Sequence, residues 1–381
     1  MSEHADQLGD RVDGAASSLV DWQLAERVAV QVAGRSPGPP GYRAHELEKD
    51  FAELTSLAED LVAEATGLRS SAGAARARVT DRAGWVRANV ASVQRLLTPT
   101  LAKIERRKAE QGSSLPFSLP RPMAGVGRSA SGLQLGLLLA WVSTRVLGQY
   151  DLLLTDDHAD DQDLVYYVGP NVVSLETRYG FPPRQFRLWL AMHEVTHRCQ
   201  FTAVPWLRDH FLTLVDRGLE PVAADPRRLA EALRRALGEL RSRRSPVPEH
   251  GIVGLVATPE QLEAIEAIQA LMSLLEGHGD VTMDRAGASQ VPGARRFAQV
   301  LRERRQQVWG PARFLQRLLG IEAKMRQYAE GEHFVTFVEA AGGTGLLQRV
   351  WQGPAMLPSL TEIRDPAAWV ARVGGAAAAS A

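Results

Sequence analysis

Two histidines and a glutamate form the pattern H-E-x-x-H at His193, Glu194 and His197. Residues four apart in a helix lie on one face about a turn apart, so both imidazoles can reach one metal ion. Glu194 follows the first histidine, where its carboxylate can take a proton from a metal-activated water. The pattern therefore requires a helix here and predicts a Zn²⁺ site with Glu194 as the general base.

The surrounding residues support a helix with an inward face. Phe181-Pro182-Pro183 comes before it, and no glycine or proline interrupts the chain from Arg184 to Ala203. Proline suits the first turn of a helix. Apolar residues share one stripe with both histidines: Phe186, Trp189, Leu190 and Phe201. Arg184, Arg187, Glu194 and Arg198 fall largely off that stripe. This spacing predicts that the histidines face inward. The alternative is a pair of core histidines that form hydrogen bonds within the protein.

A third metal ligand is expected from residues 274–280. Thr258-Pro259-Glu260-Gln261 has the features of a helix start with a capping box. The helix that follows carries Glu276 on the same flank as Ile265 and Met272. A buried carboxylate needs a partner, and a metal ion supplies one. Glu276 is the first choice as ligand, His278 the second and Asp280 the third. Glu276 could instead pair with an arginine at a helix end.

The spacing of Glu276 and Asp280 completes a longer pattern. Together they read E-x-x-x-D after H-E-x-x-H, and here the chain resembles the gluzincins, the thermolysin-like clan. In this arrangement Glu276 would bind the metal, and Asp280 could accept the N–H of a ligand histidine. Gly277 and Gly279 argue against an undisturbed helix at this point, because each costs about 1 kcal/mol relative to alanine.

Composition narrows the class of protein. The 381 residues carry no formal net charge, which argues against a nucleic-acid or membrane-surface protein. Cys199 is the single cysteine, so an intrachain disulfide is impossible, and we expect it to be a small packed residue. The N-terminus lacks the features of a signal peptide, and the longest apolar stretch, 133–146, is too short to span a bilayer. We therefore expect a cytoplasmic protein without a nucleic-acid or membrane partner, and the oligomeric state stays open.

The expected fold is mainly α with a small β-sheet (α+β). Two strands, 150–154 and 164–168, read as a hairpin around the acidic run 156–163, and 172–175 reads as a further extended segment. Helices are expected at 17–32, 43–66, 85–111, 132–147, 293–308, 311–331 and 333–341. The Pro/Gly/Ser-rich connector 112–129 suggests a boundary. The predicted domains are a disordered tail (1–16), an N-terminal helical subdomain (17–129), a catalytic region (130–374) and a disordered tail (375–381).

Several segments resemble one known family. They are 167–172, 186–189, the H-E-x-x-H motif, 200–207, 276–278, Leu357-Pro358 and Asp365-Pro366. The chain looks like a bacterial family of candidate hydrolases over about residues 20–373. These are zincin-like metallopeptidases, often labelled as associated with coenzyme-deazaflavin biosynthesis. The resemblance implies a zincin-like metalloprotease fold and a metal ion.

The predicted function is zinc-dependent hydrolysis of a peptide or amide bond. His193, His197 and Glu276 would hold Zn²⁺, and Glu194 would move the proton. Candidate oxyanion donors are Tyr328, His278 and His333, although Tyr328 could equally be a packed helix residue. The alternative function is a zinc-binding zincin scaffold that acts as a non-catalytic interaction or structural module. Hydrolysis of a non-peptide amide is a third possibility.

Overall fold

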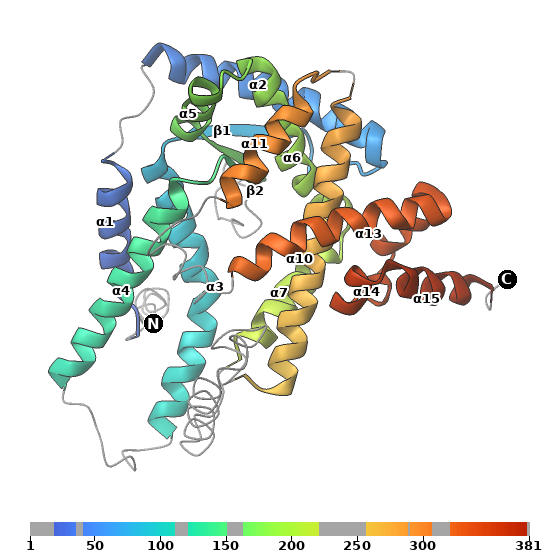
Figure 1. The fold of residues 1–381 in the computed structure, drawn as a ribbon. Coiled ribbons are helices and arrows are strands. Elements are labelled where there is room, and N and C mark those ends of the chain that lie inside the picture. The colour runs from blue at the N-terminus through green and yellow to red at the C-terminus, as the bar shows by residue number, and fades with distance from the viewer. Residues whose placement is uncertain are drawn as a thin grey trace, which may run out of the picture. The chain divides into compact units, whose positions relative to one another are not determined.

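The computed structural model of the chain describes residues 19–35, 41–110, 121–150, 163–220, 257–288, 290–306 and 321–378. By their contacts the residues form two units (Figure 1): residues 1–38 with 80–146, and residues 39–79 with 147–381. Residues 39–79 thus group with the second unit, whereas the sequence predicts one continuous N-terminal subdomain over 17–129. The predicted tail 1–16 and residues 156–162 of the acidic run lie outside the described residues.

The first unit contains three long helices in its described part. They are α1 (Trp22–Ala33), α3 (Arg82–Glu110) and α4 (Arg121–Ser143). Asp21 caps α1 by accepting a hydrogen bond from the Leu24 N–H at 2.9 Å. A Cβ at Gly136 of α4 would lie 2.6 Å from the Ala25 carbonyl oxygen of α1. The two helices therefore pack closely because α4 carries a glycine there. Helix α4 begins inside the segment predicted as a connector, at an Arg-Pro pair that suits a first turn.

The second unit contains a small sheet. Its strands are β1 (Arg76–Thr80), β2 (Gly148–Tyr150) and β3 (Leu164–Val168), in the order β1-β3-β2. Strand β2 pairs antiparallel with β3, and Gly148 lies opposite Tyr167. The second predicted strand, 164–168, is β3, but the first begins two residues earlier than predicted, and residues 151–154 of that prediction lie outside the described residues. All five residues of β3 are buried. Because β2 is last in the strand order, it is an edge strand of the described sheet. With these strands and the predominance of helices, the expected fold class is confirmed.

One strand prediction was wrong. Residues 172–175 lie in helix α5 (Gly169–Tyr179), which follows β3 directly. Pro170 sits in its first turn, and Gly180 ends it in the left-handed conformation. A Gly-Pro pair can start a helix as readily as it breaks a strand, and the valines pack against the core on the helix instead.

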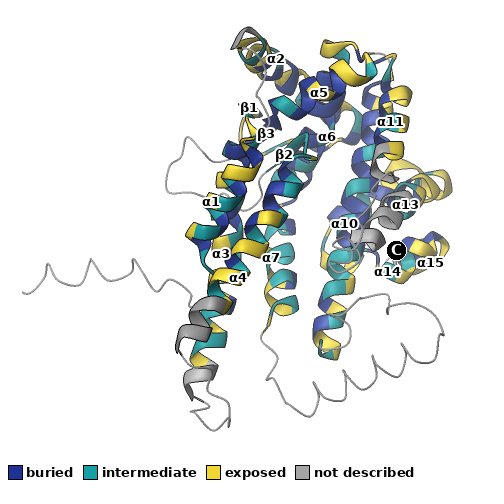
Figure 2. Ribbon diagram, turned by 60° about the vertical axis from the view of Figure 1, so that its left-hand side comes forward, coloured by how far each residue is buried: buried dark blue, intermediate teal, exposed yellow. Residues whose placement is uncertain are grey.

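Helix α6 (Pro183–Ala203) carries the H-E-x-x-H motif and is buried on nearly every side (Figure 2). The sequence predicts one inward stripe, yet Arg187, Glu194 and Arg198 off that stripe are buried as well. His193 and His197 are among the less buried residues of the helix, each with 15% of its side chain exposed. The helix is central, so its polar residues outside the motif need internal partners.

Arg198 obtains such partners from three segments. Its side chain is fully buried, and its Nε lies 3.0 Å from both carboxylate oxygens of Asp163. Its Nη1 donates to Glu59 at 2.6 Å, and its Nη2 donates to the Gly73 carbonyl at 2.8 Å. This network ties α6 to α2 (Gly41–Thr66) and to the residue that precedes β3.

We expect Asp163→Asn to lower the free energy of unfolding by about 3 kcal/mol, because it leaves a buried guanidinium with one carboxylate fewer. Asparagine tolerates the positive φ of 59° at this position, so the change isolates the charge. Denaturant titration measures the loss. Glu53→Ala removes the exposed partner of Arg184 and should barely change stability. Equal losses in both variants would contradict this interpretation.

Helix α10 (Pro259–Ala286) begins with the predicted capping box of Thr258 and Gln261 and runs unbroken through Gly277 and Gly279. It crosses α13 (Ile321–Leu347) where Gly277 meets Gly331, and a Cβ on either glycine would overlap the other helix's backbone. Gly277 is therefore explained by close helix packing. The remaining described helices are α7 (Leu207–Gly218), α11 (Ala294–Gln306), η2 (Gln348–Trp351), η3 (Pro354–Met356), α14 (Leu360–Arg364) and α15 (Pro366–Ala378). Within the described part of the chain, no helix is long and apolar enough to cross a membrane.

Candidate metal centre

Three donor atoms from two helices converge in the second unit. His193 and His197 come from α6, with their Nε2 atoms 3.2 Å apart. Glu276 comes from α10, and its Oε2 lies 3.7 Å from each of these nitrogens. Donor atoms at about 2.0–2.1 Å from a tetrahedral zinc ion would be about 3.3 Å apart. The triangle therefore has the size and the donor chemistry that a zinc ion requires.

The other predicted ligand residues lie around this triangle. The group of donor atoms within 4.8 Å of one another comprises His193, His197 and Glu276, without His278 or Asp280. Asp280 Oδ1 lies 4.0 Å from His193 Nδ1, on the side of the ring away from Glu276. That distance exceeds a direct hydrogen bond, and the role of Asp280 as the partner of a ligand histidine stays a prediction.

Glu194 lies beside the triangle and is held by the edge strand. It is only 6% exposed, and the backbone N–H of Tyr150 in β2 donates to its carboxylate. Burial raises the pKa of Glu194 to about 7; His197 and the Tyr150 N–H lower that pKa, while Glu276 raises it. Glu194 is thus a carboxyl that can exchange a proton near neutral pH.

The carboxylates of Glu276 and Glu194 stabilise positive charge at the triangle of donor atoms. Burial by itself lowers the pKa of His197, but the hydrogen bond and charge of Glu276, the charge of Glu194 and Gln200 outweigh it and raise that pKa to about 9. Positive charge at the imidazoles is therefore stabilised by the surrounding groups.

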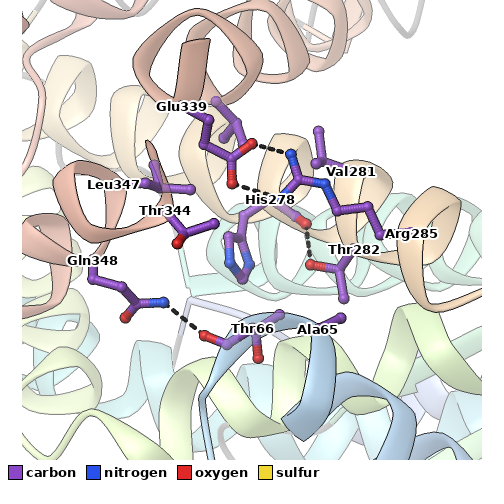
Figure 3. Close-up of a pocket in the computed structure, with 11 residues that line it drawn as sticks. Ala65, Thr66, His278, Val281, Thr282, Arg285, Glu339, Thr344, Leu347 and Gln348 are labelled. Atoms are coloured by element: carbon purple, nitrogen blue, oxygen red, sulfur yellow. Dashed lines mark hydrogen bonds and ion pairs between the residues drawn. The ribbon is translucent and has the colours of Figure 1, made fainter. Parts of the chain in front are cut away.

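His278 does not belong to the triangle, and its Nδ1 lies 3.0 Å from Gln200 Nε2 instead. Its ring is 4% exposed, lies edge-on to Trp351 with 5.3 Å between ring centroids, and lines a small cavity with Thr66, Val281, Arg285 and Glu339 (Figure 3). Burial lowers its pKa to about 4, with the charges of His197 and Arg285 acting in the same direction. Its surroundings therefore disfavour a positive charge on His278.

For His333 and Tyr328, the other two candidate oxyanion donors, the structure gives no contact with the triangle of donor atoms among the described residues. His333 is exposed on α13, where its ring contacts Phe337. The side chain of Tyr328 lies outside the described part of α13. Cys199, on the helix that carries the histidines, is fully buried, as expected, and burial raises the pKa of its thiol to about 11.

Sequence reasoning missed Gly148 and Gln200. Gly148 of β2 packs against Glu194: a Cβ there would lie 2.6 Å from Glu194 Cγ. No sequence signal marks this contact, because 46 positions separate the residues. Gln200 accepts a hydrogen bond from His197 Nδ1 at 3.0 Å. It lies three residues after His197, a spacing that places both on one helix face and could have identified it.

A central helix with two histidines that faces a glutamate from a second helix forms a possible metal site of the zincin type. Comparison with known proteins agrees, because the model of the zincin-like metallopeptidase family matches residues 20–370. The chain belongs to this family. A crystal structure from Chloroflexus aurantiacus, described as a candidate hydrolase with a novel fold, is similar with 31% identity and a TM-score of 0.67, over 93% of this chain and 99% of that one. A search of curated proteins found no match.

Proposed function

We propose that the protein is a zinc-dependent hydrolase that cleaves a peptide or amide bond. The observation that carries the proposal is the triangle of His193 Nε2, His197 Nε2 and Glu276 Oε2, with sides of 3.2, 3.7 and 3.7 Å. Two imidazoles and one carboxylate are a ligand set of catalytic zinc sites, whereas structural zinc sites are commonly rich in cysteine. The chain has one cysteine, and it is buried.

His193, His197 and Glu276 would hold the zinc ion, and this donor set would leave the ion accessible to a reactant. A zinc ion there supplies a Lewis acid that polarises a carbonyl group and makes water more acidic. Glu194 takes the proton from the attacking water and returns it to the amine as the C–N bond breaks. The products are a carboxylic acid and an amine, and no other reactant is needed. A buried carboxyl with a pKa of about 7 suits both proton transfers.

The edge strand supports this role of Glu194. Tyr150 donates its backbone N–H to the carboxylate, and Gly148 leaves room for the side chain. Strand β2 is the last in the described order β1-β3-β2, and at its outer edge the Tyr150 N–H is already taken by Glu194. An extended peptide that pairs with this edge would lie beside Glu194.

The test of the function is hydrolysis of a mixed peptide and amide library by the zinc-loaded protein, compared with Glu194→Gln. Cleavage by the wild type that a chelator stops and zinc restores is expected. Zinc bound in stoichiometric amount without cleavage of any library member would favour the alternative function, a non-catalytic scaffold. The cytoplasmic location is part of the same proposal and can be checked by cell fractionation.

We expect Gly148→Ala to lower hydrolysis by at least about tenfold while zinc still binds. Its methyl group would lie 2.6–2.8 Å from the Glu194 side chain and would push the base from its position. The measurement is kcat on the best library substrate together with zinc content. Gly180→Ala, in a turn where a Cβ meets nothing within 4 Å, serves as the control for strain alone. Equal activity of Gly148→Ala and the wild type would show that Gly148 is not needed to position Glu194.

A further inference from the structure

We propose that Gln200 is a positioning residue that fixes the ring orientation and the protonated nitrogen of His197, and that His278 in turn fixes Gln200. The proposal rests on the metal site proposed above. It assigns a function to two residues that lie behind the ligands.

Gln200 is fully buried and makes three contacts. Its Oε1 lies 3.0 Å from His197 Nδ1. Its Nε2 lies 3.0 Å from the Leu275 carbonyl oxygen and 3.0 Å from His278 Nδ1. All of the amide's hydrogen-bonding atoms are therefore engaged, and the contacts reach from α6 to α10 on both sides of Glu276.

The contacts determine which end of the amide faces which partner. A backbone carbonyl only accepts, so the amide nitrogen must face Leu275. The amide oxygen then faces His197, and because that oxygen only accepts, His197 Nδ1 must carry the hydrogen. A neutral imidazole has one N–H, which leaves the lone pair at Nε2. That is the nitrogen that lies 3.2 Å from His193 Nε2 and 3.7 Å from Glu276 Oε2.

His278 completes the arrangement. The second hydrogen of the Gln200 amide donates to His278 Nδ1, so His278 holds the amide against rotation about its last bond. Trp351 stands edge-on to the His278 ring, and Thr282 donates to the His278 backbone carbonyl at 2.7 Å (Figure 3). Neither Leu275 nor His278 could pair with the amide oxygen without leaving a buried group unsatisfied.

The result is a cross-link between the two helices that supply ligands. Leu275 and His278 flank Glu276 on α10, and Gln200 follows His197 on α6. Orientation of a ligand histidine through its second nitrogen commonly contributes 10- to 100-fold to metal affinity. Here a neutral amide supplies that contact to His197.

The first test is zinc affinity, measured by competition with a chromophoric chelator. Gln200→Met, close in volume to glutamine, should bind zinc about 10- to 100-fold more weakly than the wild type. Gln261→Met is the matched control. Gln261 is also a buried glutamine, but it lies in the first turn of α10, away from Glu276, and donates to the backbone carbonyls of Gly218 and Glu220. That control should keep wild-type zinc affinity. Wild-type affinity in Gln200→Met would overturn the proposal.

The second test reads the proton on His197 directly. In zinc-loaded protein labelled with ¹⁵N at histidine, where His197 must be neutral to bind the metal, the wild type should show His197 with its hydrogen on Nδ1, and Gln200→Met should lose this preference. Gln200→Glu keeps an acceptor for His197 Nδ1, so it should retain the preference for Nδ1. Unchanged histidine signals in Gln200→Met would overturn the proposal even if the variant were less stable.

The role of His278 is tested by a double-mutant cycle. His278→Leu should weaken zinc binding, and the double variant with Gln200→Met should bind zinc no more weakly than Gln200→Met alone. Additive losses would overturn the role of His278. The ligand set fails separately: if both His193→Ala and Glu276→Ala bind zinc like the wild type, the proposed function is wrong. If only Gln200→Met binds zinc like the wild type, the role of Gln200 is wrong and the proposed function stands.

Discussion

Protein with Glu276→Ala or His193→Ala is expected to lose its stoichiometric zinc, with affinity reduced by more than about 100-fold. Loss of an outer partner of a metal ligand already costs about 10- to 100-fold, and a direct ligand contributes more. Each variant removes one corner of the triangle and leaves two donor atoms, 3.2 Å apart in Glu276→Ala and 3.7 Å apart in His193→Ala. Metal analysis of purified, zinc-saturated and then dialysed protein measures the loss.

Glu263→Ala is a suitable control because Glu263 is exposed on the same helix as Glu276. It should retain zinc in a one-to-one ratio. The prediction fails if both ligand variants keep the zinc content of the wild type. That result would favour the alternative in which His193 and His197 are core histidines that form hydrogen bonds within the protein. Zinc retained in Glu276→Ala but lost in His193→Ala would move the third ligand elsewhere.

Glu194→Gln is expected to keep zinc and to reduce hydrolysis by about 10²- to 10⁴-fold, the usual contribution of a general base. The amide has nearly the same size, so the tight contact with Gly148 is preserved. The glutamine amide cannot accept a proton from water, so the variant loses the proton transfer but keeps the size of the side chain. The measurement pairs zinc content with kcat/KM on a library substrate.

Comparison with Glu263→Gln separates this effect from a general loss of negative charge, because that carboxylate is exposed and remote in sequence from the motif. A Glu194→Gln protein that cleaves substrate at the wild-type rate would disprove the proton-transfer role. A variant that also loses zinc would show that Glu194 acts mainly through the charge balance around His197.

Local patterns predicted much of the fold and the metal centre. Residues at i and i+4 share a helix face wherever the helix lies, so His193 and His197 could be paired from sequence. The capping box at Thr258 and Gln261 marked the start of α10, and the register of Glu276 along that helix followed from it. Strand signals likewise predicted β3 at 164–168, although its described partner β2 ends at Tyr150, where the predicted partner strand begins.

Patterns misled where one segment supports two structures. Val172 to Leu175 is extended by composition, but Pro170 starts a helix there. Gly277 weakens an isolated helix, yet the helix continues because the backbone of α13 packs against that glycine. In both cases tertiary packing outweighed a local preference of about 1 kcal/mol per residue.

The sequence alone determined which groups could form the site: a histidine pair on one helix face, a glutamate beside the first histidine, and a carboxylate on a second capped helix. These depend on spacing within single elements. Only the tertiary structure decided that Glu276 Oε2 lies 3.7 Å from both imidazoles, that Gly148 and Tyr150 hold Glu194, and that Gln200 joins His197 to His278. Most of these contacts join residues dozens of positions apart, because helix and strand packing, which no local period encodes, brings them together.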